Sequence, residues 1–238
     1  MSTLSSLKQL GIGGGPKLKS LSLAVPHLTS LESLAISDCE LFDSISDKGD
    51  DGTEWQNLKC LSSLYYNSVP NLKSIPSGLQ HVTALRSLAI YDCPNFTIFP
   101  ELASVVYLQI SRCPNLTSIP DGISNLTSLE ELYIYDCPNL KSLPDEMLSL
   151  KSLQKLTIES CPDLEKRCEK GIGEDWFKIA HSVPLGLPQA HWPSQPRPCY
   201  SQHNLWSRIG TDDANRFFDF GITGPPEFSL AINGLAIP

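Results

Sequence analysis

The segment 129–144, LEELYIYDCPNLKSLP, decides the fold of this chain. Its first half places Leu129, Leu132 and Ile134 in an L-x-x-L-x-L pattern that ends on Cys137. Its second half is a proline-bounded turn with two more apolar positions. Because one such unit cannot bury its own apolar edge, it needs a similar unit on either side.

Similar units occur along most of the chain. Their first apolar residues are spaced by 24, 30, 24, 20, 24 and 24 residues, and the turn recurs at 70–76, 94–100 and 114–120. The units begin at Leu7, Leu31, Leu61, Leu85, Val105, Leu129 and Leu153. This spacing is that of leucine-rich repeats, in which each unit contributes one short strand. We therefore predict an α/β repeat solenoid, a leucine-rich repeat horseshoe with a parallel concave sheet and about seven units.

Within each strand, side chains alternate between the core and the concave face. This alternation predicts that the core contains Leu88, Ile90, Leu108, Ile110, Leu132, Ile134, Leu156 and Ile158. We also expect reduced, inward-pointing thiols at Cys39, Cys93, Cys113, Cys137 and Cys161. A disulfide framework needs an oxidising compartment, and no cysteine pair has the ligand spacing of a zinc site.

The repeat pattern divides the chain into three segments. Residues 1–161 form the repeat array, with a polar insertion at 46–54. Residues 162–184 break the repeat, and we expect them to form a C-terminal cap. The apolar residues expected to cover the last unit are Trp176, Phe177 and Ile179. Residues 185–238 are rich in proline and have no periodicity, which predicts a disordered tail.

Composition and motifs exclude several classes of function. The formal net charge of −8 argues against a nucleic-acid partner, and no apolar run approaches the roughly 18 residues of a membrane span. The N-terminus lacks the pattern of a signal peptide, so we expect a cytoplasmic protein. The glycine-rich run at 11–15 is not a phosphate-binding loop, because Pro16 precedes Lys17. Glu174, Asp175 and His181 have no nucleophile at a useful spacing. We therefore expect no enzymatic activity, no metal and no cofactor in this chain.

The repeated CPNLKSLP-type unit and the ending CPDLEKRCEKGIGEDWFKIAH at 161–181 resemble a known family. They are similar to the C-terminal leucine-rich repeat domain of plant nucleotide-binding leucine-rich-repeat disease resistance proteins of the coiled-coil class. The resemblance covers roughly Leu7 to Pro184. It implies a domain of plant innate immunity that senses pathogen effectors or restrains an adjacent nucleotide-binding switch domain. ADP or ATP would bind in an upstream domain that is absent here, and we expect the chain to be a fragment.

A cluster of aromatic and charged residues falls on the predicted concave face. Tyrosine and arginine on a rigid surface are frequent anchors of protein–protein binding. We predict a continuous aromatic strip, edged by charges, for an effector, a guarded host protein or the receptor's own nucleotide-binding domain. The candidate residues are Tyr65, Tyr91, Asp92, Tyr107, Arg112, Glu131, Tyr133, Tyr135 and Asp136.

Three alternatives remain open at this point. Aromatic residues favour strands in general, so the tyrosines are also compatible with strand composition alone. Arg112 falls between Asp92 and Asp136 of neighbouring units, which is compatible with a simple ladder of surface charges. The alternative function is a leucine-rich repeat substrate adaptor of an F-box-type ubiquitin ligase. Such an adaptor would normally have an F-box-like helical segment upstream, and this sequence contains none.

Overall fold

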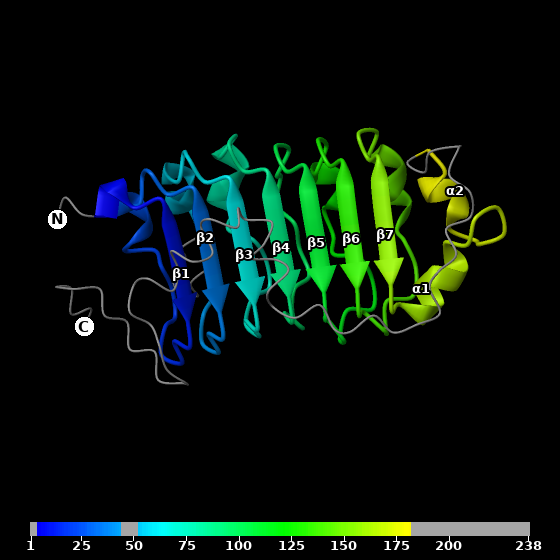
Figure 1. Cartoon of the computed structure of the whole chain (residues 1–238), viewed down its shortest axis with the longest axis horizontal. Coiled ribbons are helices and arrows are strands. Elements are labelled where there is room, and N and C mark those ends of the chain that lie inside the picture. Colours follow the sequence, from blue (N-terminus) through cyan, green and yellow to red (C-terminus); the bar gives the residue numbers. More distant parts are fainter. Residues whose placement is uncertain (1–3, 44–51, 182–238) are drawn as a thin grey trace, which may run out of the picture. The chain divides into compact units, whose positions relative to one another are not determined.

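The computed structural model describes residues 4–43 and 52–181. In this part of the chain, seven strands of five residues form one parallel sheet in chain order (Figure 1). The strands are β1 (Gln9–Gly13), β2 (Ser33–Ser37), β3 (Ser63–Asn67), β4 (Ser87–Tyr91), β5 (Tyr107–Ser111), β6 (Glu131–Tyr135) and β7 (Lys155–Glu159). The first residues of successive strands differ by the predicted 24, 30, 24, 20, 24 and 24 positions. The predicted repeat solenoid is confirmed.

Short helical turns connect most strands on one face of the sheet. They are η2 (Val25–His27), η3 (Thr53–Asn57), η4 (Ser77–His81), η5 (Ile123–Asn125) and η6 (Asp145–Ser149), whereas η1 (Leu4–Ser6) precedes β1. The connection from β4 to β5 has no helical turn, because it belongs to the shortest unit of the array. There Ile98 instead makes isolated parallel bridges to Ser74 and Asp121. The opposite face, which we call the open face, is the predicted concave face.

The core between the sheet and the helical turns follows the repeat frame. Leu132 and Ile134 are fully buried and lie in register with Leu108 and Ile110 of the preceding strand. Seven of the eight predicted core residues are buried, and Leu156 is the exception because it is only partly buried. It lies on β7, the last strand, so no further strand covers its outer side.

The five cysteines of the repeat frame are buried and free, as predicted. The thiols of Cys93 and Cys137 donate to the carbonyl oxygens of Tyr91 and Tyr135, at 3.1 and 3.3 Å. Burial raises the pKa of Cys93 to about 12, so this thiol stays protonated at neutral pH. The cysteine position is therefore a small, hydrogen-bonded core position.

The residue before the cysteine position adopts the left-handed backbone conformation in six units. Its φ lies between 47° and 58° at Asp38, Ser68, Asp92, Arg112, Asp136 and Ser160. The chain turns away from the sheet here, and in every unit but the last the backbone N–H still donates to the next strand. Asp92 N–H donates to Ser111 O and Asp136 N–H to Glu159 O, both at 3.0 Å. The extra hydrogen bond offsets the cost of the conformation, about 1 kcal/mol for a residue with a side chain.

Helices α1 (Pro162–Arg167) and α2 (Trp176–Ile179) come after the last strand. Leu164 of α1 and Ile179 of α2 are buried against the core. Of the residues predicted to cover the last unit, Trp176 packs against the core, whereas Phe177 is 59% exposed. Phe177 does not cover the array because it occupies another side of the single helical turn, beside the ammonium group of Lys178.

A buried network of charges connects this segment to the unit before it. The Asp175 carboxylate accepts hydrogen bonds from Arg167, from Lys178 and from the backbone N–H of Leu143. Lys178 Nζ also donates to Leu143 O at 2.6 Å and pairs with Asp145 at 2.9 Å. The 162–184 cap boundary itself stays a prediction. Residues 182–184, the predicted tail at 185–238 and positions 46–51 of the predicted insertion lie outside the described residues.

Candidate protein-binding surface

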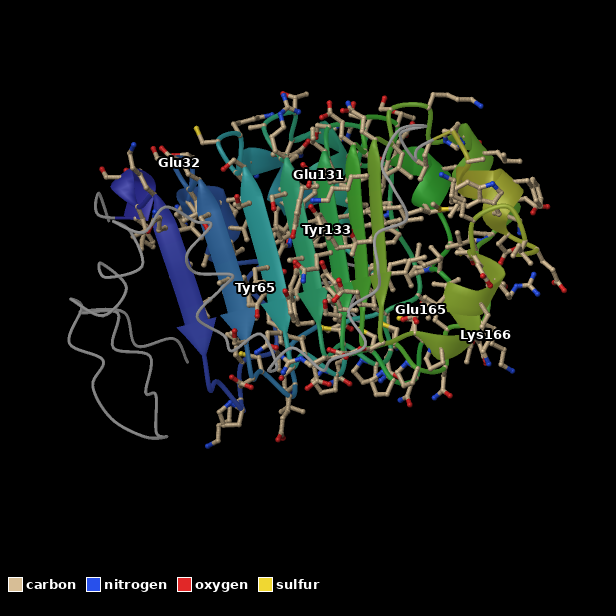
Figure 2. The ribbon with its side chains drawn as sticks, turned by 45° about the vertical axis from the view of Figure 1, so that its right-hand side comes forward. Glu32, Tyr65, Glu131, Tyr133, Glu165 and Lys166 are labelled. Carbon is tan, nitrogen blue, oxygen red and sulfur yellow. The ribbon has the colours of Figure 1, made fainter. Side chains whose placement is uncertain are left out.

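The open face of the sheet carries the tyrosines predicted from the repeat frame. They come from β3, β4, β5 and β6, and they are Tyr65, Tyr91, Tyr107, Tyr133 and Tyr135. Each alternates along its strand with a core residue, so all five lie on the same face. Figure 2 shows Tyr65 and Tyr133 midway along their strands, and Glu32 and Glu131 at the amino ends of theirs. Tyr66 confirms the alternation, because it follows Tyr65 directly and is fully buried in the core.

The tyrosine rings make contacts within two groups. In the first, Tyr65 and Tyr91 are diagonal neighbours with ring centroids 5.4 Å apart. In the second, Tyr133 lies 5.1 Å from Tyr107 and 6.0 Å from Tyr135, measured between ring centroids. We call these the first and second tyrosine groups.

The two tyrosine groups lie at different heights along the strands. Tyr91 lies opposite Ser111 at one end of β5, whereas Tyr107 begins the other end of that strand. Ala89 and Gln109 occupy the middle of the face between them. The continuous strip stays a prediction, since the sequence frame gives the face of each ring but not its height along the strand.

Tyr133 is more enclosed than its position on the open face predicts. Only 5% of it is exposed, whereas the other four tyrosines are half-buried. Tyr107 and Tyr135 pack against its ring, and Lys155 Nζ lies 5.0 Å from the ring centroid. Its hydroxyl donates to the carboxylate of Glu131. Tyr133 therefore serves as the packed centre of the second group, and its neighbours offer the accessible ring surface.

A chain of hydrogen bonds runs along β5 between the two groups. Tyr107 Oη donates to Gln109 Oε1 at 2.7 Å, and Gln109 Nε2 donates to Ser111 Oγ at 3.2 Å. Gln109 and Ser111 are both buried. The sequence frame placed Gln109, Ser111 and Lys155 on this face, although the candidate site did not include them. The sequence signal for these hydrogen bonds was Gln109, a polar residue on β5 between the tyrosine-bearing strands β4 and β6.

Arg112 interacts with the first tyrosine group and not with the flanking carboxylates. Its guanidinium lies 5.7 Å from the centroid of the Tyr91 ring, and Nη2 donates to Asn67 Oδ1 at 3.4 Å. Asp92 accepts a hydrogen bond from Ser68 Oγ at 3.2 Å. Across residues 4–43 and 52–181, no ion pair joins Arg112 to Asp92 or Asp136. The surface charges at these three positions are therefore not joined by ion pairs in the described residues.

Burial keeps the tyrosine hydroxyls of the first group neutral. Burial raises the pKa of Tyr65 to about 12, although nearby Arg112 opposes the shift, so this hydroxyl is neutral at physiological pH. Burial likewise raises the pKa of Tyr91.

Within the described ranges, no group of three histidine, cysteine or carboxylate side chains is arranged to hold a metal ion. The same part of the chain contains no helix long and apolar enough to cross a membrane.

The seven-stranded parallel array defines a leucine-rich repeat domain, a class that generally binds proteins and is typically not catalytic. Residues 1–119, half of the chain, match the family described as plant disease resistance protein RPS2-like, leucine-rich repeats. The chain belongs to this family of leucine-rich repeat domains of plant disease resistance proteins. No curated protein matches the chain.

Several solved structures are similar to the chain at low sequence identity. The leucine-rich repeat domain of the type III effector XopL is 20% identical, with 77% of this chain and 78% of that chain covered and a TM-score of 0.44. The TLR13–ssRNA13 complex is 20% identical, with coverage of 67% and 26% and a TM-score of 0.45. The ectodomain of the receptor kinase SOBIR1 from Arabidopsis thaliana is 15% identical, with coverage of 65% and 70% and a TM-score of 0.33.

Proposed function

We propose that this chain is the protein-recognition domain of a plant immune receptor of the coiled-coil class. It senses a pathogen effector, or restrains an adjacent nucleotide-binding switch domain, through its open face. The observation that carries this proposal is the pair of tyrosine groups fixed on one rigid sheet. Membership of the disease resistance family and the ending at 161–181 support the receptor class. In this proposal the domain acts in the cytoplasm, and ADP or ATP binds upstream of it.

The packing of the tyrosines prepares the face for a partner. Rings that are already held by neighbours lose little conformational freedom on binding, so their contact area contributes more fully to affinity. Tyr107 is held by Gln109, and Tyr91 is flanked by Tyr65 and Arg112. Because these rings are half-buried in the free domain, a partner that covers them completes their removal from water.

The partner would contact both tyrosine groups at once. Parallel strands lie about 4.8 Å apart, so the four strands from β3 to β6 span roughly 15 Å of sheet. A loop or helix of another protein fits this width, and its side chains can reach both groups. Truncation of a central anchor in such an interface typically costs about 2 kcal/mol or more, roughly thirtyfold in affinity.

The test compares tyrosine variants with a matched change on the other side of the array. Tyr65→Ala and Tyr91→Ala remove rings of the first group, whereas Leu148→Ala removes an apolar side chain from η6 that is 38% exposed. Each variant is placed in the receptor that carries this domain, after circular dichroism has shown that it folds. Cell death in leaves and co-immunoprecipitation with the nucleotide-binding domain or effector are then measured. We expect both tyrosine variants to weaken partner binding and to change signalling. If they behave like wild type while Leu148→Ala abolishes binding, the partner does not use the open face.

A further inference from the structure

Carboxylates surround the two tyrosine groups on the open face and its edges. Three of them belong to the left-handed turns after the strands, two lie at strand ends, and one directly precedes β2. They are Glu32, Asp38, Asp92, Glu131, Asp136 and Glu159. Among these six, in the part of the chain that the structure describes, only Glu32 forms an ion pair, with Lys8 at 2.8 Å. The face therefore has a surplus of negative charge that its own lysines and arginines do not neutralise.

Two basic residues of this face lie on aromatic rings. Arg112 lies over Tyr91, and Lys155 lies over Tyr133. A cation over a tyrosine ring is attracted by the negative face of the π system. These two contacts show that rings in both tyrosine groups accept cations in this geometry. They also leave Asp92 and Asp136 without a cationic partner from the described chain.

A shallow groove adjoins the first tyrosine group at the carboxyl ends of the strands. Its volume is about 430 Å³, and it is lined by Asp92, Arg112, Pro114, Asp136, Pro138 and Ser160. Asp92 and Asp136 occupy rigid left-handed positions whose backbone N–H groups are bonded to the next strand. Their side chains are exposed, whereas the guanidinium of Arg112 donates to Asn67 and forms no ion pair with either of them among the described residues. The groove has room for the ends of long side chains between two carboxylates.

We propose that the partner docking on the open face presents arginine or lysine side chains to it. This inference rests on the proposed function and names the chemistry of the partner: a protein segment with a cationic surface. Its guanidinium or ammonium groups pair with Asp92 and Asp136, and its aliphatic stems and cations pack on the tyrosine rings. Charge complementarity of this kind raises the association rate and selects against acidic partners.

The test uses the full purified chain and three fluorescein-labelled peptides of equal length. Their sequences are repeats of Gly-Arg, Gly-Ser and Gly-Glu, and binding is followed by fluorescence anisotropy at about 50 and 150 mM salt. We expect the Gly-Arg peptide to bind at least about tenfold more tightly than the other two. The double variant Asp92→Asn with Asp136→Asn should weaken its binding on the order of tenfold. Tyr91→Leu should weaken it about threefold without any change of charge.

The matched control removes two carboxylates away from the groove. Glu101→Gln with Glu146→Gln changes two exposed residues and alters the net charge by the same amount as the double aspartate variant. We expect this control to retain wild-type affinity for the Gly-Arg peptide. Equal weakening by the two double variants, or no preference for Gly-Arg over Gly-Ser, would overturn the proposal. Preferential binding of Gly-Glu would also overturn it, because the face would then select an acidic partner through Arg112 and Lys155.

The two proposals fail in different ways. The receptor assay measures whether the open face is used, and the peptide assay measures which charge it prefers. If the tyrosine variants abolish signalling but the double aspartate variant signals normally and shows no loss of peptide binding, the recognition face stands and the cationic partner is refuted. If the peptide results hold but the tyrosine variants signal normally, the face selects cations without serving the receptor function.

Discussion

Replacement of Asp175 by alanine should detach the C-terminal helices from the repeat array. Its carboxylate is 1% exposed and accepts hydrogen bonds from Arg167 Nε at 2.9 Å and Arg167 Nη2 at 3.1 Å. The carboxylate also accepts hydrogen bonds from Lys178 Nζ and from the backbone N–H of Leu143, each at 3.0 Å. Leu143 belongs to the turn after β6, so the carboxylate joins two segments far apart in the sequence.

The expected loss reflects the burial of this network. Removal of one partner from a buried, hydrogen-bonded charge pair typically costs about 3–5 kcal/mol, because the other charge stays buried and unpaired. Here Lys178 is itself buried, but Asp145 still pairs with it after the substitution. We therefore expect a loss at the lower end of this range, about 3 kcal/mol. Because repeats contact only their neighbours, the loss should be concentrated at β7 and α1. Urea unfolding followed by circular dichroism, with hydrogen exchange of the β7 amides, measures both effects.

Glu174 supplies the matched control for Asp175. It is the preceding carboxylate and pairs with the same Arg167, but its side chain is 76% exposed. Exposed ion pairs contribute little, so Glu174→Ala should change stability and β7 exchange only slightly. Equal effects of the two variants, or unchanged β7 exchange in Asp175→Ala, would refute the assignment of Asp175 as the residue that fastens the cap.

The same network predicts a pH dependence. Burial by itself raises the pKa of Asp175, but hydrogen bonds from Arg167, Leu143 and Lys178 outweigh it and lower the pKa below its ordinary value of 3.8. A carboxyl with a lowered pKa in the folded state stabilises the protein fully above the unfolded pKa. That stabilisation is lost as the pH falls through the folded pKa. The stability difference between wild type and Asp175→Ala should therefore be constant near neutrality and shrink below about pH 4.

Three further predictions concern the array. Leu132→Ala should lower the free energy of unfolding in urea by about 2–5 kcal/mol by leaving a core cavity, and an equal loss in the exposed Leu148→Ala would contradict the repeat frame. In the folded protein, thiol labelling followed by mass spectrometry should be fast at exposed Cys60 and slow at buried Cys137, and similar rates would contradict the buried thiol row. Ser160→Gly should raise the melting temperature, because it relieves about 0.5–1 kcal/mol of left-handed strain; a lower melting temperature would contradict it.

The repeat frame predicted the fold well because position in a unit determines burial. Each leucine of the frame lies in register with the same position of the next strand, so the strands align even where a unit has 30 or 20 residues. The extra or missing residues lie in the connections, where the short unit lacks a helical turn. Leu156 departs from the frame because its burial depends on the segment that packs beside the last strand. A repeat pattern contains no information about that neighbour.

The frame predicted the face of each tyrosine but not its surroundings. Tyr65 and Tyr66 are adjacent, and alternation alone assigns one to the open face and the other to the core. The enclosure of Tyr133 depends on diagonal neighbours in β5 and on Lys155 in β7. The direction of Arg112 depends on Asn67, two strands away. Such contacts arise from side-chain conformations across strands, and spacing along the sequence does not specify them.

The left-handed turns explain how the edge of the array can carry charge without disturbing the fold. Their structural task is performed by the backbone, since in every unit but the last the N–H continues the ladder to the next strand. The side chain is outside the core, so aspartate, serine and arginine all occupy this position at nearly the same φ. The fold therefore constrains the conformation here but leaves the charge free to vary. Arg112 connects this edge to the first tyrosine group through Tyr91 and Asn67, so a change of charge at the edge alters the surface that a partner meets.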